Sequence, residues 1–457
     1  MPSLPPGVVI ADPACLDFVF RHEGVFEKGA FFTGRSRDLF GAGIINVDGE
    51  AWRLQRKAGL RFLGVGNLAV LTGVLLPRLL ARSVEVLGRK GPAAAAVAAA
   101  AEEEGRTAAV VVDLQEVVHG ITTQLMGRMA YGMDMQTGDD FTEAFEYASG
   151  ATAERFQNPL WFVTEVFTGA KLRRSIRTIK DYGRSIVTRA IAERDSTGKH
   201  APDGEQQGED GKTDQMSGSL INSLLDSIKD ETLVADSALN YLSAGRDTVA
   251  QALTWTFYLL MRHRHVEDRV RREVENVRRQ EDPGRGSSVL APEHMTPAKL
   301  PYTTAVFYES LRLYPPIPFE IKQAQQDTCL PDGTFLPKSS IVLWCAWAMN
   351  RSTLTWGEDA DEFRPERWLE NGQLVSRSAG EFPVFNGGAR LCLGKKMAEL
   401  VAVQVIATWS AQFYFRPAYK GERVSKSSLT LPMVDGLPVF VRRLGLEDES
   451  SPPSTVD

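Results

Sequence analysis

Residues 230–263 form one long helical pattern in which apolar side chains occur on nearly every side. A helix that is apolar all round is buried in the middle of a large domain rather than laid on its surface. The chain has 457 residues, of which 43% are hydrophobic, so it can supply a core of that size. The segment therefore predicts a large fold built around one central helix.

The remaining segments predict mainly helix with a minor sheet. Residues 302–316 favour a shorter helix that stops at Pro315 and Pro316. Residues 332–349 begin with a turn and continue with β-type residues, so we expect strands there. Residues 395–415 favour another amphipathic or buried helix.

Three segments depart from this pattern. Residues 91–105 are Ala-rich with no apolar stripe, and we interpret them as an insertion that extends a surface helix or loop. Residues 194–215 are polar, charged and Gly-rich, and predict a disordered loop. Residues 447–457 form an acidic, Pro/Ser-rich tail that we also expect to be disordered.

Composition excludes several classes of protein. The net charge is -6, which does not suggest a nucleic-acid partner. None of the four cysteines forms a CxxC pair, so neither a zinc site nor a disulfide framework is indicated; they are Cys15, Cys329, Cys345 and Cys392. The most apolar run, residues 68–81, is short and broken by Pro77 and Arg78, and the first residues lack a signal-peptide pattern. As written, the chain reads as soluble.

Cys392 lies in a bare loop, FNGGARLCLG, at residues 385–394. A helix begins near Gly394, and the unpaired N–H groups of its first turn favour a thiolate over a thiol. We expect Gly387, Gly388 and Gly394 to let the backbone approach a flat ligand closely, and Arg390 to pair with an anionic group on it. Such a thiolate is a good axial ligand for haem iron. A structural cysteine or a nucleophile is the alternative for any lone cysteine.

The complete pattern Phe-x-x-Gly-x-Arg-x-Cys-x-Gly is far more specific than the cysteine alone. Average residue usage places it by chance in roughly one chain in ten thousand of this length. The pattern resembles the haem-binding signature of the cytochrome P450 family, and further motifs occur in the family's order. They are AWRLQRK with Trp52 and Arg56, AGRDT from Ala244 to Thr248, and ESLR with FRPERW, which contain Glu309, Arg312 and Arg367.

The resemblance implies a fold and a set of site residues. The fold is the cytochrome P450 fold, with one haem domain over residues 1–446, a long central helix over the haem and the cysteine loop before a proximal helix. The cofactor is haem b, iron protoporphyrin IX, with Cys392 as the axial iron ligand. The expected haem-binding residues are Trp52, Arg56, Ala244, Phe385, Gly387, Gly388, Arg390, Cys392 and Gly394, and the expected buried charge network is Glu309, Arg312 and Arg367.

Asp247 and Thr248 are the expected catalytic residues. Oxygen activation needs a proton route through an apolar pocket, with Thr248 as the local hydrogen-bond donor and Asp247 as the relay from solvent. We expect a local bulge at Gly245 to open space in the helix. The alternative is that the Asp-Thr pair bonds back to the helix carbonyls as a polar wedge. Val249 replaces a second Thr that the family often carries.

Further segments resemble the fatty-acid and alkane ω-hydroxylase branch of the family, among them LFGAGIINVDGEAWRLQRK and WGEDADEFRPERW. This implies a monooxygenase that hydroxylates a long chain at or near its end. We expect an apolar lining made by Phe156, Trp161, Phe162, Ala244, Phe319 and Leu431. No residue is identified as a carboxylate anchor. A haem-thiolate isomerase or dehydratase, a haem sensor, or a monooxygenase acting on another lipophilic molecule are the alternatives.

The resemblance also implies a partner and a location. Electrons would come from NADPH through a separate reductase, NADPH–cytochrome P450 reductase, which we expect to dock near Lys395 and Lys396. The resemblance implies a location on the cytosolic face of the endoplasmic reticulum membrane, although we expect no anchor within this sequence. Residues 8–20 resemble the helix that follows the anchor and the first strands, so we expect those strands to be absent.

Overall fold

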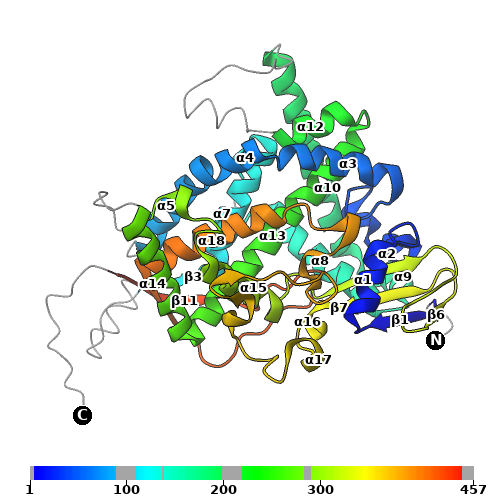
Figure 1. Ribbon diagram of the computed structural model, residues 1–457. Helices are drawn as coiled ribbons and strands as arrows, with labels where there is room; N and C mark the ends of the chain where they lie inside the picture. Colours follow the sequence, from blue (N-terminus) through cyan, green and yellow to red (C-terminus); the bar gives the residue numbers. More distant parts are fainter. Residues whose placement is uncertain (1–4, 89–109, 136–137, 198–218, 282–289, 445–457) are drawn as a thin grey trace.

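The computed structural model describes residues 5–88, 110–135, 138–197, 219–281 and 290–444 (Figure 1). Helix α13, Glu231–Arg262, runs through the middle of a helical body. A small sheet lies at the edge of that body near the N-terminus (Figure 1). The prediction of a mainly α fold with a minor β-sheet is confirmed.

The other helices surround α13 or border the sheet. They are α1 Pro13–Arg21, α2 Gly29–Phe40, α3 Gly49–Phe62, α4 Val65–Val70, α5 Leu76–Gly88, α7 Leu114–Met126, α8 Asp140–Gln157, α9 Trp161–Thr168, α10 Ala170–Thr197, α12 Ser219–Ser227, α14 Arg264–Glu281, α15 Pro301–Leu313, α16 Ala346–Met349, α17 Thr353–Trp356 and α18 Lys395–Gln412. Short turns of π- or 3₁₀-helix are η1 Leu71–Leu75, η2 Gly127–Tyr131, η3 Pro292–His294, η4 Pro365–Trp368, η5 Pro383–Phe385 and η6 Gly388–Arg390.

Capping and packing on all sides determine α13. The Asp230 carboxylate accepts hydrogen bonds from the backbone N–H groups of Thr232 and Leu233, which satisfies donors that a helix start leaves open. Most of its residues are buried, because α7, α10, α15 and α18 pack around it. Trp255 stacks on Tyr314 with ring centroids 4.1 Å apart, which fixes α13 against the end of α15.

Gly245 serves a different purpose from the one expected. The helix is α-helical throughout Glu231–Arg262, so the predicted bulge is not present. A Cβ atom at Gly245 would lie 2.5 Å from Sδ of Met126, the last residue of α7. The glycine is therefore required for the close approach of α7 to α13, and that packing offsets its cost of about 1 kcal/mol in a helix interior.

The described strands form two main sheets and two small hairpins. The first sheet has the order β1-β7-β4-β2, with β1 Gly7–Ile10 parallel to β7 Ile341–Cys345, and β4 Phe319–Ala324 antiparallel to both β7 and β2 Phe26–Glu27. The second has the order β10-β11-β3, formed by Phe413–Pro417, Pro438–Arg443 and Val110–Asp113. The hairpins pair β5 Thr328–Cys329 with β6 Phe335–Leu336, and β8 Leu369–Glu370 with β9 Gln373–Leu374.

The N-terminal strand corrects one expectation. Residues 8–20, expected to be helical, divide into the end of β1 and most of α1, and β1 pairs residue by residue with Ile341–Trp344. Three β-branched residues in succession, Val8, Val9 and Ile10, favour strand over helix. At least one strand of this sheet therefore precedes the first helix.

Three other expectations concern segments that lie wholly or partly outside the described residues. Residues 91–105 and 447–457 lie outside them. Of the expected loop 194–215, residues 194–197 belong to the end of α10, and the others lie outside the described part.

No single helix in the described ranges is long and apolar enough to cross a bilayer, while the bent pair formed by α3 and the following 65–88 segment passes that test of length and composition.

Candidate functional site: a cavity between the cysteine loop and helix α13

The cysteine loop is shaped by its packing against α1. Asn386 and Gly388 adopt positive φ angles of 59° and 58°. A Cβ atom at Gly388 would lie 2.0 Å from the backbone oxygen of Phe20, and one at Gly387 would lie 2.4 Å from the Phe20 ring. These two glycines are required for the contact with α1, and the approach of this loop to a flat ligand stays a prediction.

Cys392 lies at the end of this loop, two residues before Gly394, which is the N-cap of α18. Its backbone N–H donates a 2.7 Å hydrogen bond to the carbonyl of Phe385, which holds the turn. Its side chain is enclosed by protein yet exposed to an internal cavity, and this burial raises the pKa of the thiol. The N–H group of Gly394 and the charges of Arg56 and Lys395 act in the opposite direction. A bound metal ion would remove the thiol proton outright.

The cavity has a volume of about 400 Å³ and is bounded by elements from distant parts of the chain. Its lining includes Cys392 and Met397 from the region of the cysteine loop, and Ala244, Gly245 and Thr248 from α13. Most of the other lining side chains are apolar, and they include Phe40, Ile44, Phe145, Ile317 and Phe319. The tertiary structure thus places the cysteine loop and the AGRDT motif at the same apolar cavity.

Trp52, Arg56 and Arg390 meet at one edge of this cavity. Both guanidinium groups lie near the Trp52 ring, that of Arg56 at 5.3 Å and that of Arg390 at 4.3 Å from the ring centroid. Arg390 already pairs with Glu23 at 3.0 Å and Asp48 at 2.5 Å. Arg56 donates to a carbonyl, that of Leu391 at 3.1 Å, and burial lowers the pKa of its guanidinium. Its charge thus remains available to a carboxylate at this edge.

Thr248 faces the cavity with its hydroxyl group already used as a donor. The hydroxyl donates a 2.7 Å hydrogen bond to the carbonyl of Ala244, one turn back on α13. A threonine hydroxyl has one proton and two lone pairs, so in this arrangement it presents an acceptor to the cavity. The donor role expected from the sequence therefore requires the Thr248 hydroxyl to give up its hydrogen bond to the Ala244 carbonyl.

Asp247 belongs to a buried charge cluster between α13 and α7. One carboxylate oxygen accepts a 2.6 Å bond from Arg246 and lies 4.0 Å from Nδ1 of His119. Burial lowers the pKa of His119, while the nearby Asp247 charge raises it. Nothing in the sequence pointed to His119, a lone histidine 128 positions before Asp247 that only the packing of α7 on α13 brings to the site.

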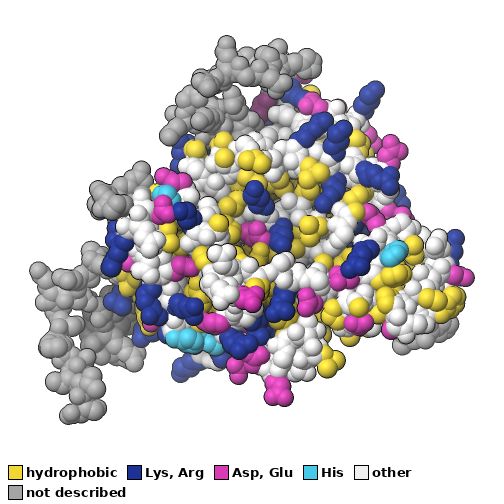
Figure 2. Space-filling model, viewed as in Figure 1, with side chains coloured by type: hydrophobic (Ala, Val, Ile, Leu, Met, Phe, Trp, Pro, Cys, Tyr) yellow, Lys and Arg dark blue, Asp and Glu magenta, His cyan; other side chains and the backbone are white. Residues whose placement is uncertain are grey.

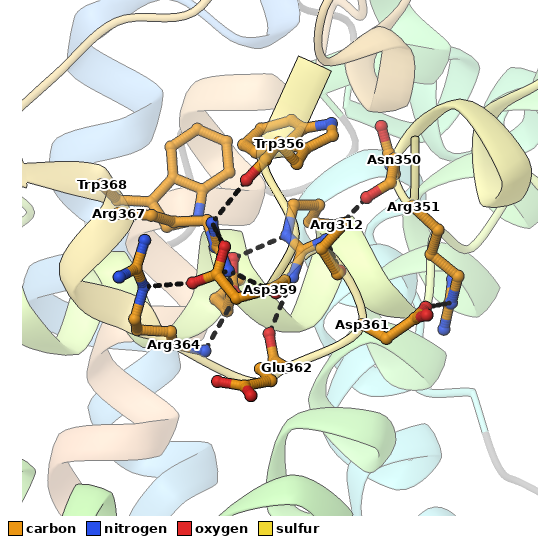
Figure 3. Close-up of polar contacts among 12 residues, drawn as sticks. Arg312, Asn350, Arg351, Trp356, Asp359, Asp361, Glu362, Arg364, Arg367 and Trp368 are labelled. Atoms are coloured by element: carbon orange, nitrogen blue, oxygen red, sulfur yellow. Dashed lines mark hydrogen bonds and ion pairs between the residues drawn. The ribbon is translucent and has the colours of Figure 1, made fainter. Parts of the chain in front are cut away.

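A second buried cluster holds α15 to the segment that follows α17 (Figure 3). Both Glu309 oxygens accept bonds of 2.8 Å from Arg312, and one also accepts a 2.8 Å bond from Arg367. The indole of Trp368 donates to the other oxygen at 2.9 Å. Arg312 also donates to the carbonyls of Asn350, Ala360 and Glu362, which tethers the irregular chain to α15 (Figure 3).

Only some of the residues predicted to line a substrate pocket line the cavity in the structure. Phe319 and Ala244 line the cavity. Phe156 instead packs on Phe31 and Phe32, and Leu431 is buried with its carbonyl accepting the indole N–H of Trp255. The revised lining in this region consists of Leu429 and Thr430, which precede Leu431.

The remaining two predicted pocket residues lie on α9 at the surface. Trp161 covers the guanidinium of Arg155 at 4.5 Å, and Phe162 is 59% exposed. No residue of α9 is buried. Both side chains therefore lie outside the cavity lining. The side of α9 that faces the protein carries Glu165, whose carboxylate pairs with the Arg155 guanidinium at 2.6 Å.

The two lysines at the start of α18 are accessible. The Lys395 side chain is 42% exposed and Lys396 is exposed. A Cβ atom at Gly59 would meet the Leu393 side chain at 2.4 Å, so α3 packs directly beside this point. Arg53, Lys57 and Arg61 on α3 are exposed as well, and Figure 2 shows Lys and Arg side chains gathered over α3.

The donor set around the cavity fits haem. It offers a thiol on one wall, an apolar facing wall and guanidinium groups at the edge where carboxylates would lie. Such a site, beneath a long central helix, defines the class of haem-thiolate enzymes. When bound, haem ligated by a thiolate activates dioxygen for insertion of one oxygen atom into a C–H bond.

Comparison with known proteins identifies the family. The family profile described as Cytochrome P450 matches residues 5–432. Cytochrome P450 86B1 of Arabidopsis thaliana is 33% identical over 94% of this chain and 76% of its own length. Cytochrome P450 94C1 of the same plant is 30% identical over 95% of this chain and 84% of its own length. Cytochrome P450 94A1 of Vicia sativa is 26% identical over 95% and 81%. The chain belongs to the cytochrome P450 family and is a monooxygenase of that family.

Proposed function

We propose that this monooxygenase hydroxylates a long aliphatic chain, a fatty acid in particular, at or near its end. The observation that carries the proposal is the apolar cavity that reaches Cys392 on one side and Thr248 on the other. The sequence resemblance to the fatty-acid and alkane ω-hydroxylase branch supports the same substrate class. An apolar lining of this kind suits an aliphatic chain.

Regioselectivity must come from shape. A primary C–H bond is stronger than the secondary bonds beside it, so terminal attack requires the inner carbons to be kept away. Phe319 lies at the start of β4, lines the cavity and is 59% exposed, so its ring can narrow the approach to the reacting end. Positioning of this kind changes rates strongly with small displacements.

Product analysis tests this proposal. The haem-loaded protein would be supplied with NADPH, a reductase and saturated fatty acids of graded length. We expect terminal or near-terminal hydroxy acids, and Phe319→Ala should shift products toward inner positions. Phe335→Ala, at a similarly exposed phenylalanine of the β5–β6 hairpin, is the control that should leave the product ratio unchanged. Turnover of bulky polycyclic compounds without any fatty-acid product would contradict the substrate class.

The same assay separates the other functions. A haem-thiolate isomerase or dehydratase would form product without NADPH and dioxygen, and a haem sensor would form none. The Asp247–Arg246–His119 cluster beside Thr248 favours the monooxygenase, because it places titratable groups between the cavity wall and α7. We propose that Asp247 and His119 pass protons toward Thr248.

Electron supply is proposed to come from an acidic reductase domain. The support is the group of exposed cations formed by Arg53, Lys57 and Arg61 on α3 with Lys395 and Lys396 on α18. These side chains lie around the Cys392 loop, so a partner that docks there would be close to the proximal side of the haem. Opposite charges at such a surface accelerate association.

A further inference from the structure

The aromatic rings behind the cysteine loop form a continuous series. Phe385 lines the cavity, and its ring centroid lies 6.3 Å from that of Phe382. The Phe382 ring lies 4.7 Å from that of Trp368 and 6.0 Å from that of Tyr308. The rings of Trp368 and Tyr308 are 5.2 Å apart. Aromatic rings at these separations pack favourably, and this series also leads away from the cavity toward α15.

Tyr308 is the oxidisable member of the series that reaches solvent. It lies on α15 and is half-buried, whereas Trp368 is 1% exposed. The Tyr308 O–H donates a hydrogen bond to the carboxylate of Glu399 on α18. Burial, and then the charge of Glu399, raise the pKa of the Tyr308 phenol, so the phenol keeps its proton at neutral pH. Tyr308 therefore has a proton acceptor and access to solvent in the same place.

Trp368 has a carboxylate beside its ring as well. Its indole N–H donates a 2.9 Å hydrogen bond to Glu309. An aromatic ring that loses an electron becomes positive, so a nearby carboxylate stabilises the oxidised ring, and it does so more strongly in a buried site than in water. Arg367, which also pairs with Glu309, lies 3.3 Å from Asp359, so a second carboxylate helps to offset the cations of this cluster.

The other oxidisable rings at the cavity have less favourable surroundings. Trp52 has the guanidinium groups of Arg56 and Arg390 at 5.3 and 4.3 Å from its ring centroid. Such cations oppose the loss of an electron from the ring. Tyr241 lines the cavity, but its O–H donates to the backbone carbonyl of Gln55 at 2.9 Å, and a peptide carbonyl does not take up the proton. The pair behind the cysteine loop is therefore better suited to hold an oxidising equivalent.

We propose that Trp368 and Tyr308 are an electron-donating pair that protects the haem and Cys392 from oxidising equivalents that are not used on a substrate. Trp368 relays electrons between the Phe382 side of the series and Tyr308. Tyr308 is the end of the pair that an external reductant reaches. The proposal concerns turnover without product, so it does not depend on which substrate the enzyme hydroxylates.

The chemistry is a sequence of one-electron steps. Hydrogen peroxide takes up two electrons and two protons and gives two waters. For each electron that Tyr308 gives through Trp368 to the haem side, its O–H bond breaks and the proton passes to Glu399. An external one-electron reductant such as ascorbate then returns an electron, and the phenol regains its proton from Glu399. Two such cycles reduce one peroxide, and the protons of the two waters come from solvent.

The experiment mixes the haem-loaded, substrate-free protein rapidly with hydrogen peroxide. Electron paramagnetic resonance of freeze-quenched samples detects an amino-acid radical, and the loss of haem absorbance measures haem destruction. Peptide mass spectrometry of the wild type maps the residues that become oxidised.

Three variants isolate the pair. Tyr308→Phe keeps the ring and removes the O–H, and Trp368→Phe keeps an aromatic ring that is much harder to oxidise. Tyr302→Phe is the matched control on the same helix. The Tyr302 O–H also donates to a carboxylate, that of Glu366 at 3.1 Å, but its ring faces the Arg269 guanidinium at 4.0 Å.

The wild type should show a tyrosyl radical signal that ascorbate removes, with oxidation mapped to Tyr308 and Trp368. Tyr308→Phe should lose the tyrosyl signal and lose its haem absorbance faster, because no donor with a proton acceptor remains at the end of the series. Trp368→Phe should form the tyrosyl signal more slowly. Tyr302→Phe should match the wild type in both measurements.

The proposal is overturned if Tyr308→Phe retains the tyrosyl signal and loses haem no faster than the wild type. Mapping in the wild type gives a second test that needs no variant to fold. Oxidation at Trp52 or Tyr241, with none at Tyr308 or Trp368, would also overturn the proposal. A failure of the proposed fatty-acid hydroxylation leaves these outcomes unchanged, since no substrate is present.

Discussion

The protonation state of a single residue at the cavity depends on several features of its surroundings that act in opposite directions. Cys392 is the clearest case, since the start of α18 and the charge of Arg56 favour the thiolate while burial favours the thiol. Burial prevails in the protein by itself, and the pKa is raised. A metal ion reverses this balance, because a coordinated thiol is deprotonated. The residue is thus suited to a bound metal rather than to free nucleophilic chemistry.

We predict that Cys392→Ala abolishes the thiolate-type absorption spectrum of the reduced carbonyl complex. The physical reason is that the thiolate donates electron density to the iron, and alanine has no donor atom. Cys329→Ala, on the exposed β5–β6 hairpin, is the matched control and should leave the spectrum intact. A normal spectrum in Cys392→Ala would assign the iron ligand to another residue.

A second prediction concerns the hydroxyl of Thr248. Thr248→Ala should retain haem and consume NADPH, but release more of the reducing equivalents as hydrogen peroxide and less as product. Thr248→Ser keeps the hydroxyl that bonds to the Ala244 carbonyl and should stay close to the wild type. The measurement is the ratio of product to NADPH consumed. An unchanged ratio in Thr248→Ala would mean that protons reach the site without this side chain.

At the scale of elements, the close packing of α7 on α13 depends on one missing methyl group. We predict that Gly245→Ala destabilises the fold by about 1–3 kcal/mol, because its Cβ would overlap Met126, which is buried. Met126→Ala should recover part of this loss in the double variant, since it removes the overlapping sulfur. Chemical denaturation of all three variants measures the coupling. Additive effects would show that the contact does not limit the packing.

The Glu309 cluster makes a different element-scale prediction. Glu309→Ala leaves the buried guanidinium groups of Arg312 and Arg367 without their carboxylate, at a cost of about 3–5 kcal/mol. We expect little haem-loaded protein and a lower melting temperature. Glu275→Ala on α14 breaks an ion pair with Arg278 near the surface and should cost less than about 1 kcal/mol. Equal free energies of unfolding for the two variants would show that the Glu309 cluster does not stabilise the fold more than a surface ion pair.

At the scale of the whole molecule, charge is distributed unevenly. The net charge is -6, yet exposed cations gather around the cysteine loop. The carboxylates that accompany them on the face in Figure 2 do not prevent basic side chains from clustering over α3. A local potential of this kind steers an acidic partner even when the overall charge is negative.

We predict that changing Lys395 and Lys396 together to Glu slows reduction by the reductase and flattens its dependence on salt. The reason is that the exposed charges act on the encounter rate, which salt screens. Lys338→Glu, an exposed position between β6 and β7, is the control for net charge. Stopped-flow reduction at several salt concentrations gives the rates. Equal rates for the wild type and the double variant would remove these lysines from the docking surface.

The sequence alone determined the elements and the chemistry that local patterns encode. All-round apolarity predicted α13, and the helices around 302–316 and 395–415 followed from periodicity and proline stops, because these signals act over a few turns. The spacing around Cys392 and the other motifs identified the family. The burial and contact of Glu309, Arg312 and Arg367 agree with what the family resemblance implied, whereas the i,i+3 spacing of Glu309 and Arg312 alone suggests a surface pair.

The tertiary structure decided what faces the cavity. Phe162 and Phe319 are similar in the sequence, yet the first lies on exposed α9 and the second lines the cavity, because their orientation depends on the packing of whole elements. The amine of Lys322, which has no hydrogen-bond partner among the described residues, is visible only once the structure shows that Glu320 and Glu23 pair with other cations. His119 reaches Asp247 only through the contact of α7 with α13. Long-range contacts join residues far apart in the chain, and no local pattern encodes which of them meet.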